Sequence, residues 1–462
     1  MGNPRNDTTN GDVQLPAVRI IGGGLAGSEA ALQLAARGFR VSLYEMRPEV
    51  PSPAHHGGDL AELVCSNSLK SDDPDTAAGL LKRELSLLGS HLLQIARYHA
   101  VPAGAALAVD RVAFARDVTA AVESEPLITV IREECTELEA SGIPTIVAAG
   151  PLASPALADA LATLIGSDYL SFYDAAAPIV EADTLDTTRV FAASRYGKGD
   201  GNDYLNIALD EDEYRTLHDF LIHAERVTAR DFERRELFAA CQPIEEVART
   251  GFDALRYGAL KPVGVDDPRT GRWPYALIQL RAENRGRTLY NLVGFQTNLT
   301  FPEQRRMLSL IPGLQTAEIA RYGVMHRNSF VDGPRVLQPD LSLQAAGTIR
   351  IAGQLSGTEG YCEAIATGLV TALNTVAQLR GTAPFILPDT TALGSLLRYA
   401  TDPDTTDYQP MHVNFGLIAP LTPRVRNKRE RYHTYSQRAQ ADLTALIAGR
   451  PDLFSLPAES AA

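Results

Sequence analysis

The clearest pattern of hydrophobic positions lies near the start of the chain. Val18–Ile21 is a short apolar run typical of a buried strand, and the SEAALQLAARG that follows the next turn repeats apolar residues at helical spacing up to Gly38. FRVSLYE then predicts a second strand that ends at Glu45. A strand, a glycine-rich turn, a helix, a second strand and an acid together form the βαβ unit that binds dinucleotides.

The turn GGGLAG, at positions 22–27, supplies the residue types that such a unit needs. Gly22 permits the tight turn, Gly24 lets the backbone approach a pyrophosphate, and Gly27 lets the helix pack closely on the strand. The helix N-terminus adds free N–H groups and a partial positive charge. Glu45 is placed to accept hydrogen bonds from ribose hydroxyls, which favours FAD or NAD over NADP. The residues predicted to contact the cofactor here are Gly22, Gly23, Gly24, Leu25, Ala26, Gly27 and Glu45.

Two later segments favour FAD over NAD. Residues 141–152 predict a strand that ends on Ala-Gly-Pro, and residues 348–368 predict a strand, a glycine-rich turn and a helix that starts near Gly360. In two-part FAD folds, a late strand–turn–helix of this kind brings its helix N-terminus to the flavin end of the cofactor, where glycines permit close backbone approach. The alternative is an ordinary βα turn. The predicted contacts are Gly150, Gly353, Gly357 and Gly360.

The chain has 462 residues, of which 45% are hydrophobic, enough for two packed domains. Because the cofactor-binding segments lie far apart in sequence, the predicted fold is α/β, a discontinuous Rossmann-type FAD-binding domain with an inserted α+β domain. The middle of the chain mixes an amphipathic helix, EDEYRTLHDFLIHAERV, with strands such as YALIQLRAEN. The predicted bounds are 1–16 for a disordered tail, 17–186 and 301–462 for the two parts of the FAD-binding domain, and 187–300 for the insertion.

Composition and charge narrow the location and the partners. No run of about 18 uncharged apolar residues is present, and the first sixteen residues lack the regions of a secretory signal, so we expect a cytoplasmic protein. The net charge of −13 argues against a broad surface that coats nucleic acid but is compatible with a local basic patch. The densest basic run is RVRNKRERYH, from Arg424 to His433, which is either such a patch or the solvated face of a helix.

The cysteines are scattered, with no CxxC pair, and we expect reduced thiols. They are Cys65, Cys135, Cys241 and Cys362. Each is either a small buried hydrophobic residue or a reagent. The adjacent His55 and His56 point apart, and no acidic cluster with metal-ligand spacing accompanies them, so no metal site is predicted.

Two cysteines have the sequence context of reagents. Cys65, in LAELVCSNSLKSDD, is predicted in or beside a loop after the second strand, on the cofactor side of the sheet, with polar neighbours. Cys241, in AACQPIEEVARTG, precedes Pro243, which is predicted to be a first-turn residue of the helix IEEVART. A thiolate is favoured near a helix N-terminus. We therefore predict chemistry across a cleft between the cofactor and the inserted domain.

Several long blocks of the chain resemble one family. They are GGGLAGSEAA, LVCSNSLKSD, FYDAAAPIV, SRYGKGDGNDYLN, CQPIEEVARTG, LRYGALKPVG, GFQTNLTFPEQ, MHRNSF and AGQLSGTEGYCEA. They are similar to the folate- and FAD-dependent tRNA (uracil-5-)-methyltransferases, the TrmFO family, which is related to the GidA-type flavoproteins. The resemblance covers roughly residues 17 to 435.

The resemblance implies a methyl transfer to carbon 5 of the T-loop uridine of tRNA, giving ribothymidine. The carbon would come from methylenetetrahydrofolate, with reduced FAD as relay and NAD(P)H as reductant. The family's two functional cysteines fall on Cys65 and Cys241. We expect Cys241 to add to carbon 6 of uracil and Cys65 to protect or protonate the methylene held on the flavin, or to take the proton from carbon 5; the two roles could be exchanged.

Other residues take expectations from the same resemblance. Lys70, Arg256 and Lys261 would stabilise enolate or phosphate charge. The basic run near the C-terminus becomes a predicted tRNA contact, since an acidic protein that binds a polyanion must concentrate its cations. The target uridine would have to flip out of its loop. The oligomeric state stays open, with a monomer favoured.

Three alternatives remain on sequence grounds. The first is the flavoprotein that modifies the wobble uridine of tRNA with a GTPase partner, although such proteins are usually longer. The second is a plain FAD-dependent oxidoreductase, which predicts a second complete GxGxxG, whereas this chain has one. The third is a non-catalytic RNA chaperone, in which the cysteines would be dispensable.

Overall fold

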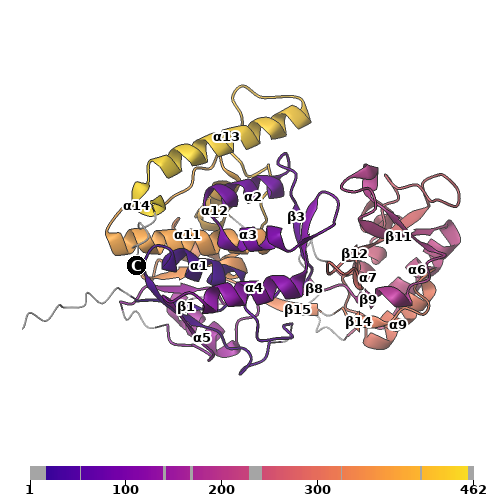
Figure 1. Cartoon of the computed structure of the whole chain (residues 1–462), viewed down its shortest axis with the longest axis horizontal. Coiled ribbons are helices and arrows are strands. Elements are labelled where there is room, and N and C mark those ends of the chain that lie inside the picture. The colour runs from indigo at the N-terminus through magenta and orange to yellow at the C-terminus, as the bar shows by residue number, and fades with distance from the viewer. Residues whose placement is uncertain are drawn as a thin grey trace, which may run out of the picture.

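The computed structural model describes residues 17–52, 54–138, 142–166, 170–227, 242–323, 325–405 and 408–455. The predicted tail, 1–16, and Cys241 lie outside these ranges. The described residues form two units side by side, each with its own hydrophobic core (Figure 1). The first unit holds both the start and the end of the chain, and the second consists of a middle portion.

The first unit is built on a five-stranded parallel sheet in the order β16-β7-β1-β2-β6. The strands are β1 (Ala17–Ile21), β2 (Arg40–Tyr44), β6 (Ile128–Ile131), β7 (Thr145–Val147) and β16 (Ile349–Ile351). Strand β16 joins the sheet from the far end of the sequence by pairing with β7. This arrangement confirms the predicted Rossmann-type α/β fold made from two distant parts of the chain.

The predicted glycine turn between β1 and α1 (Leu25–Ala35) is present and depends on its glycines. Gly22 has a φ of +103°, a conformation that side-chain-bearing residues rarely adopt. A Cβ on Gly27 would lie 1.8 Å from the carbonyl oxygen of Gly22, so only glycine lets the first turn of α1 pack this close to the end of β1. The sequence therefore dictates both the turn and the approach of the helix.

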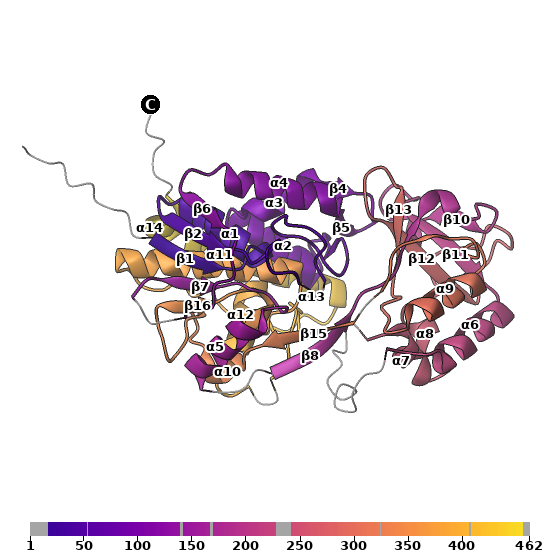
Figure 2. The ribbon, with the colours of Figure 1, turned by 90° about the horizontal axis from the view of Figure 1, so that it is seen from below.

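Helix α1 packs against β1, β2 and β6 of the parallel sheet, and Figure 2 shows α11 (Tyr361–Arg380) lying across the same sheet. Helix α11 is buried along most of its length and packs on α1 at Gly368, where a Cβ would meet the carbonyl oxygen of Ala26 at 2.2 Å. Helix α13 (Lys428–Ala448) lies along the outside of this unit, above α2 (Ala77–Leu87) in Figure 1. The helices of the unit besides α1 are α2 (Ala77–Leu87), α3 (His91–Tyr98), α4 (Arg111–Glu123), α5 (Pro155–Ile165), α10 (Gly333–Val336), α11 (Tyr361–Arg380), α12 (Ala392–Thr401), α13 (Lys428–Ala448) and α14 (Pro451–Phe454).

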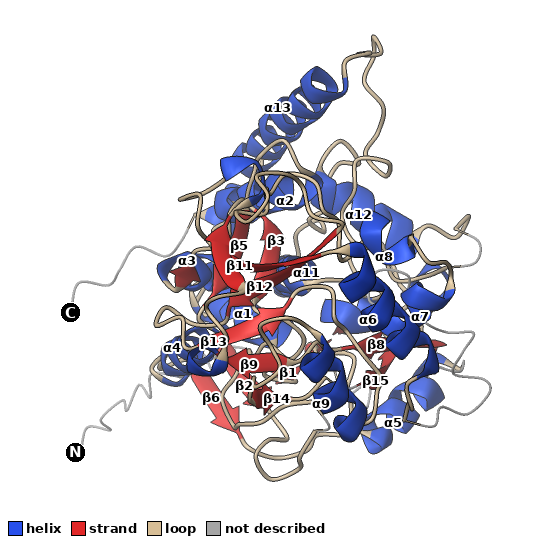
Figure 3. Cartoon of the chain, turned by 90° about the vertical axis from the view of Figure 1, so that its right-hand side faces the viewer, coloured by secondary structure: helices blue, strands red, loops and turns tan. Residues whose placement is uncertain are grey.

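The second unit is an antiparallel sheet in the order β10-β11-β12-β13-β9-β14, with four helices against it (Figure 3). The strands are β9 (Ile179–Glu181), β10 (Val190–Ala193), β11 (Tyr204–Leu209), β12 (Ala276–Ala282), β13 (Leu289–Leu292) and β14 (Ile319–Arg321). The helices are α6 (Glu211–His223), α7 (Ile244–Arg249), α8 (Ala254–Tyr257) and α9 (Phe301–Leu310). The inserted α+β character is confirmed. The bounds 187–300 stay a prediction. Two strands of the sheet lie outside that range in sequence, β9 before it and β14 after it.

Two smaller sheets lie toward the junction of the units. Strands β8 (Leu170–Ala175) and β15 (Met325–Phe330) pair antiparallel, and Figure 2 shows them extending from the first unit toward the second. Strands β3 (Ser68–Ser71), β5 (Ala106–Val109) and β4 (Ala100–Val101) form the other sheet. In the described ranges, no helix is long and apolar enough to cross a membrane.

Two buried carboxylates hold helices of the first unit by their N-termini. Glu29 accepts hydrogen bonds from the backbone N–H of Leu92 at 2.8 Å, in the first turn of α3. Glu84 accepts from the N–H groups of Ala392 (2.7 Å) and Leu393 (2.9 Å), the first residues of α12. Complete burial raises the pKa of Glu84 to about 7, although these two hydrogen bonds act to lower it.

The raised pKa of Glu84 predicts a pH-dependent stability. A carboxyl that binds its proton more tightly in the native state stabilises that state below its ordinary pKa of 4.5 and loses this contribution as pH rises through about 7. The free energy of unfolding should therefore lose up to about 3 kcal/mol between pH 4.5 and 8 through this group. Urea unfolding of the wild type and of Glu84→Gln across this range measures it. The stability difference between the two should shrink or reverse as pH rises; a difference constant with pH would contradict the assignment.

Candidate active site

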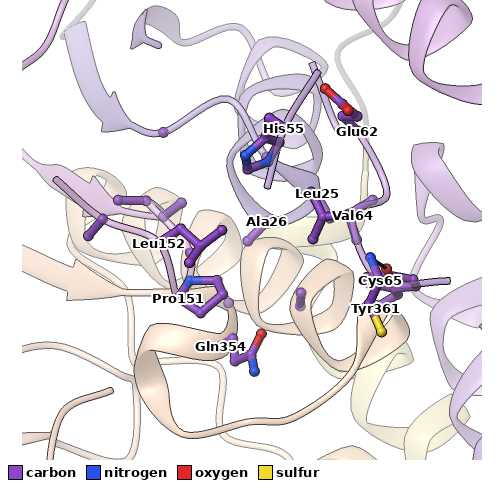
Figure 4. Close-up of a pocket in the computed structure, with 18 of the residues that line it drawn as sticks. Leu25, Ala26, His55, Glu62, Val64, Cys65, Pro151, Leu152, Gln354 and Tyr361 are labelled. Carbon is purple, nitrogen blue, oxygen red and sulfur yellow. Dashed lines mark hydrogen bonds between the residues drawn. The ribbon is translucent and has the colours of Figure 1, made fainter. Parts of the chain in front are cut away.

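A cavity of about 330 Å³ opens at the carboxyl ends of the parallel strands. Ile21, Glu45 and Ala148, which end or follow β1, β2 and β7, all line it. In open α/β sheets, ligands bind at this edge. The predicted site residues that line the cavity are Gly22, Gly24, Leu25, Ala26, Glu45, Cys65, Gly150, Gly353 and Gly360. Figure 4 shows Leu25 and Ala26 of α1 between His55 on one side and Gln354 on the other.

Gly24 leaves room where a pyrophosphate would be expected. It is the N-cap of α1, and no side chain caps this helix. A Cβ on Gly24 would meet nothing within 4 Å, so the space in front of the helix N-terminus is open. A helix N-terminus with uncapped N–H groups facing an open cavity attracts an anion.

The other predicted glycines lie behind the cavity wall. The N–H of Gly23 donates to Oε2 of Glu45 at 2.9 Å, which orients that carboxylate. Gly27 permits the close packing of α1 on β1. A Cβ on Gly357 would lie 1.9 Å from the hydroxyl oxygen of Tyr408, so this glycine admits a buried tyrosine behind the late glycine turn.

Glu45 is a buried carboxylate held by its neighbours. Its Oε1 accepts hydrogen bonds from the backbone N–H of Arg47 (3.0 Å) and from the Nε of the same residue (2.9 Å). Burial alone would raise the pKa of Glu45, but the hydrogen bonds from Arg47 and its charge bring that pKa below its ordinary value. A carboxylate has about four lone-pair positions, and three are used here, which leaves about one for a ribose hydroxyl. The sequence pattern did not reveal Arg47 as the partner.

Cys65 lies in the loop between β2 and β3, at the end of the sheet where the cavity opens, as predicted. Its side chain is half-buried and lines the cavity, close to Tyr361 (Figure 4). The Tyr361 hydroxyl accepts hydrogen bonds from the backbone N–H of Cys65 (2.9 Å) and of Ser66 (3.1 Å). Burial raises the pKa of Tyr361, so the hydroxyl keeps its proton.

The three predicted cations lie in different places. Lys70 lines the cavity, with its Nζ 3.9 Å from Oε1 of the buried Glu363. Arg256 forms an ion pair with Asp253 (2.6 Å) and stacks over the ring of Tyr275, 3.7 Å from its centroid. Lys261 is exposed on the second unit. Of the three, Lys70 alone is among the described residues that line the cavity.

The segment that follows Cys241 is anchored to the cavity wall, although Cys241 itself lies outside the described residues. Helix α7 starts at Ile244 with Pro243 as its N-cap, one residue later than predicted. The N–H of Ile244 donates to the carbonyl oxygen of Gln296 at 2.7 Å, and Gln296 lines the cavity. Glu245 also accepts from the N–H of Asn298 at 2.7 Å. The start of α7 is thus tied to the loop of the second unit that contributes Gln296 to the cavity.

The sequence pattern missed Tyr361 and Gln296. Tyr361 follows the last of the predicted glycines and could have been found as the first residue of a helix whose N-terminus was predicted to face the cofactor. Gln296 lies in the block GFQTNLTFPEQ, but nothing in that block places its side chain at the cavity, which it reaches through the packing of the two units. Among the described residues, no group of three or more His, Cys, Asp or Glu could hold a metal ion.

Comparison with known proteins decides which family shares this arrangement. The family model described as "Glucose inhibited division protein A" (GIDA) matches residues 17–383. The methylenetetrahydrofolate–tRNA-(uracil-5-)-methyltransferase TrmFO of Moorella thermoacetica is 53% identical over 422 residues, which are 91% of this chain and 96% of that protein. The chain belongs to the TrmFO family. The TrmFO of Geobacter sulfurreducens is 52% identical over 432 residues, covering 94% of this chain and 99% of that protein.

A solved structure shares the fold at much lower identity. The GidA structure from Aquifex aeolicus, in its form II crystal, has a TM-score of 0.69 and 18% identity, covering 97% of this chain and 75% of that one. This likeness concerns the fold alone. The high identity to TrmFO proteins, over nearly their whole length, sets this chain apart from the wobble-uridine alternative.

Proposed function

We propose that this chain methylates carbon 5 of the T-loop uridine of tRNA, with methylenetetrahydrofolate as carbon donor, FAD as relay and NAD(P)H as reductant. The observation that carries this proposal is the sequence identity of 52–53% to TrmFO methyltransferases over 91–94% of the chain. In the balanced overall reaction, uridine, methylenetetrahydrofolate, NAD(P)H and one proton give ribothymidine, tetrahydrofolate and NAD(P)⁺.

The residues around the cavity fit FAD. The open N-terminus of α1 at Gly24 would receive the pyrophosphate, and Glu45 would accept from the adenosine ribose. Gly353 and Gly360 would face the flavin end, beside the N-terminus of α11. When bound, reduced FAD would carry the methylene group and supply reducing electrons.

The proposed chemistry on the uracil ring is carried by thiols. The sulfur of Cys241 forms a bond to carbon 6, and the electrons of the 5,6 double bond move into an enolate, which makes carbon 5 nucleophilic. Carbon 5 then takes the one-carbon group, whose bond to its carrier breaks, and a base removes the proton from carbon 5. A hydride equivalent that derives from NAD(P)H completes the methyl group, the sulfur–carbon bond breaks, and the double bond is restored. We assign the proton transfer to Cys65, whose backbone is fixed by Tyr361 at the cavity.

Incubation of the purified protein with unmodified tRNA, methylenetetrahydrofolate and NAD(P)H tests the proposal. Nucleoside analysis should show ribothymidine at the T-loop position, and omission of either small molecule should prevent it. A folded, yellow protein that oxidises NAD(P)H without forming ribothymidine would instead support a plain FAD-dependent oxidoreductase.

The basic run before and within α13 supports a tRNA contact. Arg424 and Arg426 precede the helix, and Lys428 and Arg431 lie 5.5 and 5.6 Å from the ring centre of Tyr432. Tyr432 in turn stacks on Phe415, with ring centres 4.1 Å apart. Cations beside stacked aromatic rings suit phosphates and unstacked bases.

Charge reversal in this run should weaken tRNA binding in a salt-dependent way. In the triple variant Arg424→Glu, Arg426→Glu and Arg429→Glu, log affinity should fall less steeply with log salt. The magnitude of the slope should decrease by about 1 to 3, roughly one for each phosphate that is no longer neutralised. Arg40→Glu is a control for charge reversal elsewhere on the surface, since Arg40 is exposed at the start of β2, at the end of the sheet opposite the cavity. Filter binding at several salt concentrations measures both. Equal slopes for the triple variant and the wild type would remove this run from the tRNA contact.

A further inference from the structure

The loop that carries Cys65 is held by side chains from elements distant in sequence. The carbonyl of Leu63 accepts from Nη1 of Arg111, on α4, at 3.2 Å. The carbonyl of Val64 accepts from Nη2 of Arg321, on β14 of the second unit, at 2.8 Å. The next two N–H groups donate to Tyr361, the first residue of α11. The backbone of residues 63–66 is therefore tied to α4, β14 and α11.

Asn67 completes this set through its side chain. It is fully buried, and its Nδ2 donates to the carbonyl oxygens of Val109 (3.0 Å) and Ala282 (2.9 Å). Its Oδ1 accepts from the Nε of Arg281 at 2.9 Å. Both amide hydrogens are thus used, one toward β5 of the first unit and one toward β12 of the second.

Several contacts between the two units near this loop are polar, beside a small apolar cluster of Val101, Ala103 and Ala108 with Tyr204. Arg111 pairs with the buried Glu283, just after β12, at 2.6 Å. The main hydrophobic cores of the two units are separate clusters and do not merge here. Hydrogen bonds and charges fix distance and direction more strictly than apolar contact does. The position of the Cys65 loop therefore depends on that of β12 through specific polar contacts, and Asn67 makes the central ones.

We propose that Asn67 is a positioning residue that sets the Cys65 thiol in the cavity according to the placement of β12. The proposal rests on the role of Cys65 in the proposed function. Asn67 does not line the cavity among the described residues, so it acts through the loop. Because Ala282 and Arg281 belong to the unit that also holds the start of α7, the same contact relates the Cys65 loop to the segment after Cys241.

Two substitutions and a matched control test this role. Asn67→Ala removes all three side-chain hydrogen bonds, and Asn67→Asp keeps the acceptor for Arg281 but sets a carboxylate oxygen against two carbonyl oxygens. Asn206→Ala is the control, because Asn206 is a fully buried asparagine of the second unit whose Nδ2 also donates to backbone carbonyls, including that of Ala193 at 2.9 Å. All are made in the full-length, FAD-loaded protein, with melting temperature measured alongside.

The decisive readout is the rate at which iodoacetamide alkylates Cys65, followed by peptide mass mapping. Loosening the loop should raise this rate about fivefold or more in both Asn67 variants, and kcat for ribothymidine should fall about tenfold or more with KM for tRNA nearly unchanged. Asn206→Ala should leave both quantities within about twofold at a similar loss of melting temperature. Asn67 variants that match Asn206→Ala in alkylation rate would overturn the proposal. Absence of ribothymidine with the wild type would remove the proposed function, while the alkylation rates would still decide the role of Asn67.

Discussion

Cys241→Ala is expected to reduce ribothymidine formation by about a thousandfold or more, since carbon 5 of uracil is a poor nucleophile until a thiolate adds to carbon 6. The variant should retain its flavin spectrum and its affinity for tRNA, because the cavity wall at Gln296 is anchored by the backbone of Ile244, after the substituted position. Nucleoside analysis and filter binding measure these quantities. Methylation at the wild-type rate would leave the non-catalytic chaperone as the better account.

A covalent trap separates the roles of the two cysteines. In a T-arm RNA with 5-fluorouridine at the target position, fluorine replaces the hydrogen that carbon 5 must lose as a proton. Because fluorine cannot be removed in this way, the sulfur–carbon bond to the attacking cysteine persists. We expect the trapped complex on denaturing gels with the wild type and Cys65→Ala, but not with Cys241→Ala. The reverse pattern would exchange the two roles and make Cys65 the nucleophile.

Gly24→Asp is expected to abolish FAD binding while keeping the fold, which is an unusual combination for a glycine in a binding motif. Asp is a favoured N-cap, α1 has no side-chain cap, and the φ of −73° at Gly24 suits any residue. The new carboxylate would satisfy the N–H groups that a pyrophosphate needs and would repel its charge. FAD affinity should fall by at least about a hundredfold, with the melting temperature of the flavin-free protein unchanged or higher.

The neutral substitution Gly24→Asn separates charge from size. It is a similarly good N-cap of nearly equal volume, so it should weaken FAD binding less than Gly24→Asp does. Flavin fluorescence titration and thermal unfolding measure the two effects. Full FAD occupancy in Gly24→Asp would show that the cofactor does not use the N-terminus of α1.

The parts of the fold that were predictable are those that have local causes. The turn at Gly22–Gly27 and the acid at Glu45 were readable because backbone geometry and close packing demand those residue types at that spacing. A second glycine-rich turn far along the chain predicted that a late strand joins this domain, and the structure shows that this strand, β16, pairs with β7. These signals predict a site at the carboxyl ends of the parallel strands, where the cavity lies.

The parts that were not predictable depend on contacts between distant segments. No local pattern marks Arg47, which holds Glu45, and Gln296 lies in a block that resembles the family but has no local pattern that places it at the cavity. Asn67 is one polar residue among several in CSNSLKSDD, and only the packing of β12 against the loop shows that it is fully buried. The start of α7 at Ile244 differed by one residue from prediction, since Pro243 serves as N-cap and not as a first-turn residue.

Isotope tracing of the methyl group tests the central claim most directly. Methylenetetrahydrofolate with two deuterium atoms on the transferred carbon should give ribothymidine whose methyl group carries both, with the third hydrogen supplied by the reduced cofactor or by solvent. Folate deuterated at carbon 6 of its pterin ring should leave the product unlabelled, because the reducing electrons come from NAD(P)H. Ribothymidine without deuterium in the first experiment, or with deuterium in the second, would contradict the account.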